Sequence, residues 1–141
     1  MKKYRIQEEI VLDTNVLISG IIKPYNPPAK ILNLIVEGQL ILVLDARIFD
    51  EYSRVLKRKR FSFPTSLIDE ILSYIKTKGR FITPNVVDIP LPDPSDLPFV
   101  EVALNARVPI ITGNIKHFKI PGLEVFTPSA FLRKRGMLRI Q

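Results

Sequence analysis

The chain has 141 residues, of which 46% are hydrophobic and 25% charged, a composition typical of one globular domain rather than of a disordered, collagen-like or coiled-coil chain. It contains no cysteine, which excludes a disulfide scaffold and a thiolate metal site. Its net charge of +7 is compatible with a polyanionic partner.

The N-terminal residues are basic, but the apolar run that follows them is soon interrupted by Asp13 and Asn15. A signal peptide or a membrane span needs a longer apolar segment. We therefore expect a cytoplasmic protein without a membrane partner.

The first half of the chain alternates apolar runs with helical patterns. The predicted elements are, in chain order, a strand at 9–12, a helix at 15–22, a helix between Asn26 and Gly38, a strand at 40–44 and a helix from Asp45 to about Arg60. Asn26 followed by two prolines is typical of the first turn of a helix. The strand at 40–44 is apolar throughout, as in parallel sheets that are covered on both faces.

The second half is punctuated by prolines. It predicts a helix at 65–78, weak strand signals at 81–82 and 86–87, a helix at 93–106, strands at 108–112 and 124–126, and a short helix from Thr127-Pro128 to about Gly136. Alternation of strands with helices indicates a mostly parallel sheet. We predict an α/β fold with three layers (α/β/α) around a mostly parallel central sheet.

Polar side chains are expected to converge at one edge of this sheet. Asp13 directly follows the first strand, and Asn114 follows the third clear strand. At 100° per residue, Glu51 lies at the margin of the apolar face of its helix, and Asp96 projects within the apolar face of its own helix. The carboxyl ends of parallel strands share one edge of a sheet, where ligands bind.

Each acid also has a purely structural interpretation. Asp13 or Asp96 can cap a helix, Glu51 can pair with a nearby Lys or Arg, and Asp93 can form a turn instead of serving as a second ligand. Clustered carboxylates nevertheless need a counter-charge, because each raises the pKa of the others. Without Cys or a His cluster, a hard cation such as Mg²⁺ or Mn²⁺ is expected. In a basic protein, such a site indicates hydrolysis of nucleic-acid phosphodiesters.

Four segments carry a resemblance to a known family. They are Leu12-Asp-Thr-Asn-Val-Leu17, Glu51 within 49–56, Asp93-Pro-Ser-Asp-Leu-Pro-Phe-Val-Glu-Val-Ala103 and Ile111-Thr-Gly-Asn-Ile-Lys-His-Phe118. Together with residues 125–132, they resemble a PIN domain over about residues 10–132. The chain is most similar to the subgroup of toxin components of toxin–antitoxin systems, the VapC-like ribonucleases.

The resemblance implies a single PIN-like domain over residues 1–141 that cleaves single-stranded RNA with Mg²⁺ or Mn²⁺. It implies catalytic roles for Asp13, Glu51, Asp96 and Asn114, of which the three acids would also bind the metal. Family members commonly form dimers, and the toxins are inhibited by a small antitoxin. A homodimer and an antitoxin partner are therefore implied as well.

The chain departs from the family pattern at its fourth acid. Asn114 stands where many PIN domains have aspartate, and His117 stands where many such toxins have another acid. One metal ion is therefore expected rather than two, with Asp93 as a compensating metal ligand. Asn15 and Thr112 are implied to orient the acids through hydrogen bonds.

Several other residues have interpretations that the structure tests. Arg54, Lys57 and Arg58 follow Glu51 on its helix, either as RNA contacts or as a solvated face that suits the helix dipole. Tyr52 is expected in the core. His117 is expected to be at the surface or hydrogen-bonded, and Glu101 to face water.

Three functions are distinguished. The first is a metal-dependent ribonuclease, and the second is a degenerate PIN domain that binds RNA or protein without cutting. The third is a receiver-like or phosphatase-like α/β domain in which Asp13 accepts a phosphoryl group. The third lacks a suitable lysine, because Lys116 is poorly placed after the late strand.

Overall fold

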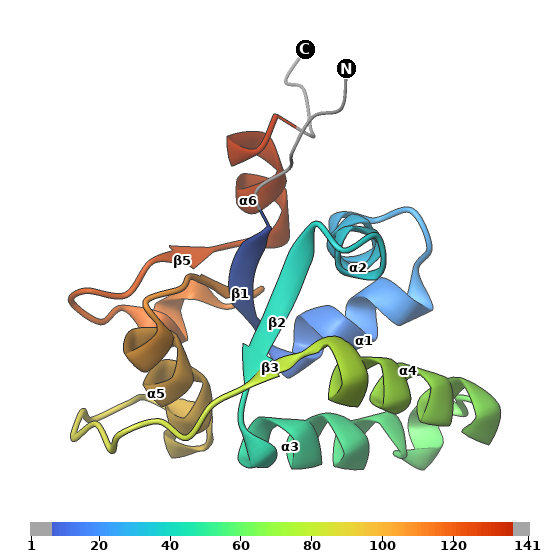
Figure 1. The fold of residues 1–141 in the computed structure, drawn as a ribbon, viewed down its shortest axis with the longest axis horizontal. Coiled ribbons are helices and arrows are strands. Elements are labelled where there is room, and N and C mark those ends of the chain that lie inside the picture. Colours follow the sequence, from blue (N-terminus) through green and yellow to red (C-terminus); the bar gives the residue numbers. More distant parts are fainter. Residues whose placement is uncertain (1–6, 137–141) are drawn as a thin grey trace.

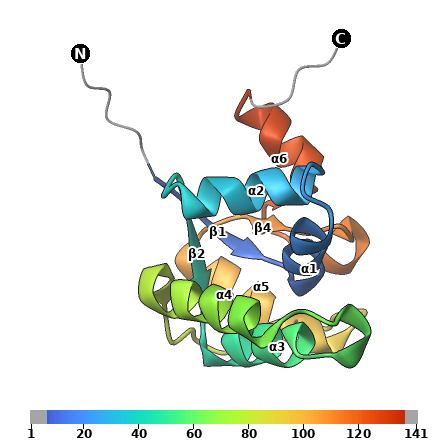
Figure 2. The same cartoon turned by 90° about the vertical axis from the view of Figure 1, so that its right-hand side faces the viewer.

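The computed structural model of the chain describes residues 7–136 (Figures 1 and 2). Its strands are β1 (Glu8–Leu12), β2 (Leu40–Leu44), β3 (Arg80–Phe81), β4 (Ile110–Ile111) and β5 (Val125–Phe126). Its α-helices are α1 (Thr14–Ile22), α2 (Pro27–Val36), α3 (Ala46–Leu56), α4 (Thr65–Lys78), α5 (Leu97–Ala106) and α6 (Pro128–Lys134). Three 3₁₀ helices complete the set: η1 (Lys59–Phe61), η2 (Pro94–Asp96) and η3 (Ile115–Phe118).

The five strands form one all-parallel sheet in the order β3-β2-β1-β4-β5. The predicted α/β fold with a mostly parallel sheet is therefore confirmed. The order differs from the 2-1-3-4-5 arrangement of flavodoxin-like and receiver domains, which argues against the phosphoryl-acceptor hypothesis.

Helices cover the sheet on both sides. In Figure 1, α5 lies on one side of β1 and β2, and α2 and α4 lie on the other. α5 contacts β1, β2 and β4, whereas α2 and α4 contact β2. The central strand β1 is correspondingly apolar, and its last three residues, Ile10, Val11 and Leu12, have no exposed surface. Burial on both faces explains why these strands read as continuous apolar runs.

The helix predicted from Asp45 to Arg60 is too long. α3 ends at Leu56, Lys57 is its C-cap, and the chain resumes as the short η1. The physical reason is that 57–60 are four consecutive basic residues, which leave no apolar face to hold a further turn against the core.

The helix predicted at 93–106 is divided. Residues 94–96 form η2 and the α-helix begins at Leu97. Asp93 starts the tighter turn, because its side chain accepts a hydrogen bond from the backbone N–H of Ser95 at 3.0 Å. The strand signal at 86–87 is wrong, because the backbone there bonds to side chains of α5 rather than to a neighbouring strand.

Within residues 7–136, every helix is too short or too polar to cross a lipid bilayer.

Candidate functional site

The topology brings two strand ends together at the centre of the sheet. β1 lies beside β4, with Leu12 opposite Ile111, so Asp13 and Thr112 follow adjacent strands at the same edge. The chain fills the sheet from β1 outward to β3 and then returns to the other side of β1 with β4. This reversal is where open parallel sheets leave a ligand crevice.

Asp13 is nearly buried, with 8% of its surface exposed. It occupies the N-cap position of α1, but its side chain makes no capping hydrogen bond. Instead, the Thr112 hydroxyl donates to Asp13 Oδ2 at 2.7 Å. The sequence-based alternative of a purely capping aspartate is therefore not what the structure shows.

Thr112 joins the two strand ends. It is fully buried, and its hydroxyl oxygen also accepts a hydrogen bond from the backbone N–H of Asn114 at 3.0 Å. The orienting role implied for Thr112 thus has a geometric basis. The side chains of Asn114 and Asn15 are exposed, and neither forms a hydrogen bond with an acid among the residues that the structure describes.

Glu51 lies on α3, and its side chain faces the beginning of α1. The Thr14 hydroxyl, one residue after Asp13, donates a hydrogen bond to Glu51 Oε2. Arg54 approaches the other carboxylate oxygen only to 3.9 Å, with 65% of its own side chain exposed. An ion pair of this length and exposure contributes little. Glu51 is therefore anchored mainly to the segment that carries Asp13.

Asp93, Asp96 and His117 form a compact group at the start of α5. Nδ1 of His117 lies 3.2 Å from Asp96 Oδ2. Asp93 accepts hydrogen bonds from both the amide and the hydroxyl of Ser95. One potential ligand atom from each of the three residues lies within 4.8 Å of the others. Asp93 is thus both a turn former and a candidate ligand, and His117 is hydrogen-bonded, as its sequence-based interpretation allowed.

Electrostatics link this group to Asp13 and Glu51. Burial, and then the negative charge of Glu51, raise the pKa of Asp13, although the Thr112 hydrogen bond opposes the shift. Burial, and then the charge of Asp13, raise the pKa of Asp96, against the effect of His117. Glu51 therefore lies close enough to Asp13, and Asp13 close enough to Asp96, to disfavour the ionisation of Asp13 and Asp96.

The donor set fits a divalent cation. Carboxylate oxygens are what Mg²⁺ and Mn²⁺ prefer, and an imidazole suits Mn²⁺ better than Mg²⁺. Asp13 and Glu51 are not in the group whose ligand atoms lie within 4.8 Å of one another. Mg²⁺ retains several waters when it binds to few carboxylates, so Asp13 and Glu51 can act on such an ion through water.

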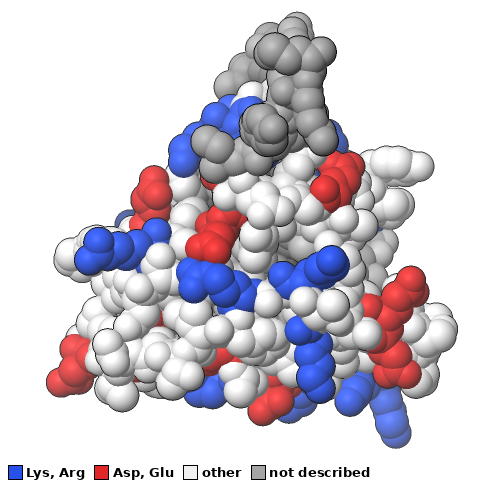
Figure 3. All heavy atoms as spheres, in the orientation of Figure 1, with Lys and Arg blue, Asp and Glu red and all other residues white. Residues whose placement is uncertain are grey.

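Of the basic residues predicted to contact RNA, Arg54 lies on α3, and Lys57 and Arg58 follow the end of this helix. Arg54, Lys57 and Arg58 are all exposed. On the face shown in Figure 3, lysine and arginine side chains are spread among acidic ones and do not merge into one patch. All three basic side chains are therefore accessible from solvent.

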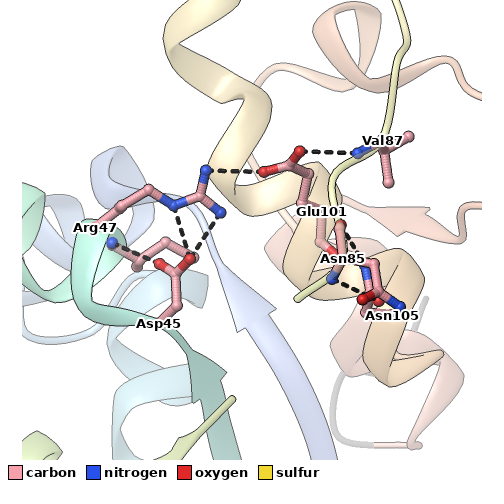
Figure 4. A network of polar contacts seen from close by, with 7 residues as sticks. Asp45, Arg47, Asn85, Val87, Glu101 and Asn105 are labelled. Atoms are coloured by element: carbon pink, nitrogen blue, oxygen red, sulfur yellow. Dashed lines mark hydrogen bonds and ion pairs between the residues drawn. The ribbon is translucent and has the colours of Figure 1, made fainter. Parts of the chain in front are cut away.

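A second polar network joins α3 to α5 (Figure 4). Arg47, near the start of α3, binds Asp45 with Nε at 2.8 Å and Glu101 with Nη1 at 2.8 Å. The expectation that Glu101 faces water is wrong, because only 3% of its surface is exposed. Burial acts to raise its pKa, but the Val87 amide and Arg47 outweigh that effect, and the pKa is lowered.

Sequence reasoning missed three polar residues in this region. Thr14, the partner of Glu51, was passed over although it follows Asp13 directly. Arg47 carried a usable signal, since it lies four residues before Glu51 and therefore on the same face of the helix. Glu101 carried another, as the one charge in the otherwise apolar α5.

Comparison with known proteins identifies the family and the fold of the chain. The family model described as "PIN domain" matches residues 9–116. An uncharacterized protein of Methanocaldococcus jannaschii, MJ1680, is 31% identical over 147 aligned positions, which cover 94% of this chain and 95% of that protein. The crystal structure of VapBC2 from Rickettsia felis, bound to a DNA fragment from its promoter, has a similar fold, with a TM-score of 0.59 and 16% identity over 85% of this chain and 98% of that one. The chain therefore belongs to the PIN-domain family.

Proposed function

We propose that this PIN domain is a Mg²⁺- or Mn²⁺-dependent endoribonuclease that hydrolyses phosphodiester bonds of single-stranded RNA. The observation that supports it is the convergence of Asp13, Glu51 and Asp96 from three different elements, where the charge of Glu51 raises the pKa of Asp13 and the charge of Asp13 raises the pKa of Asp96. Such an arrangement costs stability in an empty site. Binding of a divalent cation offsets that cost.

The residues that would hold the cation are Asp96, with Asp93 and His117 beside it, and Asp13 and Glu51 acting across water. A divalent cation supplies a water of lowered pKa and stabilises the leaving oxygen of a phosphodiester. Asp13 is held by Thr112 so that its orientation is set before substrate arrives. Asp96 is held in the same way by His117. Asn114, exposed at the end of β4, is proposed to contact the substrate through its uncharged amide.

We further propose that the protein is the toxin of a toxin–antitoxin pair and forms a homodimer. This proposal rests on the sequence resemblance to VapC-like proteins and is supported at the level of fold by the VapBC2 structure. A short neighbouring reading frame that encodes a small DNA-binding protein, and co-purification of its product with this chain, would test it.

The nuclease proposal predicts loss of RNA cleavage in two single variants. Asp13→Asn and Asp96→Asn should each reduce cleavage of a mixed single-stranded RNA pool by about 100-fold or more, while circular dichroism remains that of the wild type. EDTA should abolish cleavage by the wild type, and added Mn²⁺ should restore it. Asp50→Asn is a matched control, because Asp50 is an exposed acid on the same helix as Glu51. A well-folded Asp13→Asn protein that cuts RNA at the wild-type rate would refute the assignment.

A binding module without catalysis is the second candidate. It is favoured by Asn114 and His117, which replace the fourth negative charge expected of an active site. Titration calorimetry separates the two candidates, because the enzyme must bind Mn²⁺ near neutral pH. An RNA-binding module would instead bind RNA equally well with EDTA.

A further inference from the structure

Glu51 and Asp96 belong to elements whose relative position the sheet does not fix directly. Glu51 lies in the second turn of α3, and Asp96 precedes α5. Helices donate their backbone hydrogen bonds internally, so the spacing between α3 and α5 depends on contacts between side chains. Among these contacts, an ion pair between Arg47 and Glu101 joins the two helices directly.

The guanidinium of Arg47 is held from two sides. Nη1 lies 2.8 Å from Glu101 Oε1, and Nη2 lies 2.7 Å from Asp45 Oδ2. Asp45 is itself fixed, because its other oxygen accepts the backbone N–H of Ile48 at 3.0 Å, which caps α3. Asp45 and Glu101 have 6% and 3% of their surfaces exposed. Charged hydrogen bonds to buried acceptors have strict geometry and are strong, so this bridge resists sliding of one helix past the other.

The bridge also holds the segment that leads to Asp93. The second carboxylate oxygen of Glu101 accepts the backbone N–H of Val87 at 2.9 Å. One turn along the helix, the Asn105 side chain bonds to both the N–H and the C=O of Asn85. Figure 4 shows these contacts side by side along α5. The extended chain before Asp93 is thus fastened to the helix that follows Asp96.

We propose that Arg47 and Glu101 are positioning residues, whose ion pair sets the separation of Glu51 from Asp93 and Asp96 and thereby the affinity of the site for a divalent cation. This inference rests on the proposed metal-dependent function. The placement of the pair supports it. Arg47 lies one turn before Glu51 on the same face of α3, and Glu101 lies five residues after Asp96. Neither residue belongs to the compact ligand group itself.

For Arg47→Met, positioning and simple electrostatics predict changes of opposite sign in Mn²⁺ affinity. This variant removes a positive charge one helix turn before Glu51, which by charge alone strengthens the binding of Mn²⁺. Loss of helix positioning weakens it. Arg47→Lys keeps the charge but cannot span two carboxylates with a planar fork. Glu101→Gln leaves one side-chain oxygen as an acceptor, whereas the Glu101 carboxylate accepts from Arg47 with one oxygen and from the Val87 N–H with the other. All three variants are expected to weaken Mn²⁺ binding by about tenfold, which is the lower end of the effects measured for residues that orient metal ligands.

The experiment is a calorimetric titration of the purified full chain with MnCl₂, at a temperature well below the unfolding midpoint of each variant. The dependence of RNA cleavage on Mn²⁺ concentration is measured alongside. Arg80→Met is the matched control. Arg80 forms an equally close two-point ion pair with Glu9, at 2.7 and 2.8 Å, between two strands. The Arg80→Met substitution should lower the unfolding midpoint and leave the affinity for Mn²⁺ unchanged. Circular dichroism checks that each variant is folded. If Arg47→Met does not fold, Arg47→Lys takes its place, because it leaves the net charge unchanged.

The outcomes are separable. Wild-type Mn²⁺ affinity in the folded Arg47 and Glu101 variants would overturn the positioning role while leaving the nuclease proposal intact. If the wild type never cuts RNA but the variants still bind Mn²⁺ more weakly than it does, the positioning role is supported and the nuclease proposal is refuted. A wild type that binds no Mn²⁺ would overturn both.

Discussion

At Asp13, two physical effects oppose ionisation of the carboxyl group, and hydrogen bonds support it. Burial and the charge of Glu51 raise the pKa above its ordinary value of 3.8, against the pull of the Thr112 hydroxyl. The folded state therefore retains a proton on Asp13 in a pH range where the unfolded chain has released it. Without a cation, ionised Asp13 destabilises the fold.

This predicts that Asp13→Asn stabilises the metal-free protein. The pKa of Asp13 in the folded state lies above its ordinary value of 3.8. The wild type therefore loses stability as the pH rises from 3.8 through the folded pKa. The loss is about 1.4 kcal/mol for each unit by which the folded pKa exceeds the unfolded one. The amide side chain does not titrate and still accepts the Thr112 hydrogen bond. In EDTA, the variant should have the larger free energy of unfolding at about pH 7, and the difference should shrink as the pH is lowered toward about 4. Urea unfolding at several pH values measures this.

Added Mn²⁺ provides the internal check on that prediction. It should raise the unfolding midpoint of the wild type by mass action and have a much smaller effect on Asp13→Asn. Asp50→Asn, an exposed change on α3, should follow the wild type throughout. Equal stability of wild type and Asp13→Asn at neutral pH in EDTA would show that Asp13 is not destabilised by its surroundings.

At the scale of elements, continuous apolar runs were the most informative pattern. The bounds of β2 at Leu40–Leu44 and of α4 at Thr65–Lys78 are as predicted, because an unbroken apolar strand and a capped amphipathic helix each have one consistent period. The strand at 108–112 shrinks to Ile110–Ile111. Its flanking residues still form backbone bonds, and such ends depend on neighbouring strands that a sequence does not display.

The candidate site was partly predictable for the same reason. Asp13 follows an unmistakable strand, whereas the burial of Glu101 could not be predicted from the spacing of apolar residues. Glu101 lies opposite its helix's main apolar arc, but the extended chain at Val87 covers it and Arg47 pairs with it. Burial by a segment with no regular structure leaves no periodic signal.

The crossing of α1 and α2 offers a test of packing between elements. A Cβ added to Gly20 would lie 2.7 Å from the Leu32 side chain and 2.9 Å from the backbone oxygen of Pro28. The side chain can move, but the backbone oxygen of Pro28 is held at the first turn of α2. Gly20→Ala should therefore destabilise the protein by about 1–3 kcal/mol, measured as a lower midpoint of urea unfolding.

Gly113→Ala is the matched control for that change. Nothing lies within 4 Å of a Cβ at Gly113, and its φ is not in the left-handed region. It should leave the free energy of unfolding within about 0.5 kcal/mol of the wild type. If Gly20→Ala were as stable as Gly113→Ala, the close approach of the two helices would not constrain the fold.

At the scale of the whole molecule, a positively charged protein carries a local cluster of acids. The net charge is +7, yet the strand ends at the centre of the sheet gather carboxylates. RNA approaching the proposed site is repelled by those acids unless basic side chains on the surface or a bound cation compensate. Long-range attraction and local metal binding are therefore separate requirements, and different experiments test them.

The end of α3 is where the long-range attraction is proposed to act. Lys57 and Arg58 are exposed, and they directly follow the helix that carries Glu51. The double variant Lys57→Ala/Arg58→Ala should weaken binding of a fluorescent single-stranded RNA in EDTA. It should also reduce the slope of log affinity against log salt by about 0.7 for each phosphate that the variant no longer neutralises. Fluorescence anisotropy over a range of KCl concentrations gives both quantities.

Lys30→Ala on the exposed face of α2 removes a charge far along the chain from these residues and should leave the slope unchanged. If the double variant and the α2 variant had the same slope as the wild type, the basic end of α3 would be a solvated surface and the RNA path would lie elsewhere.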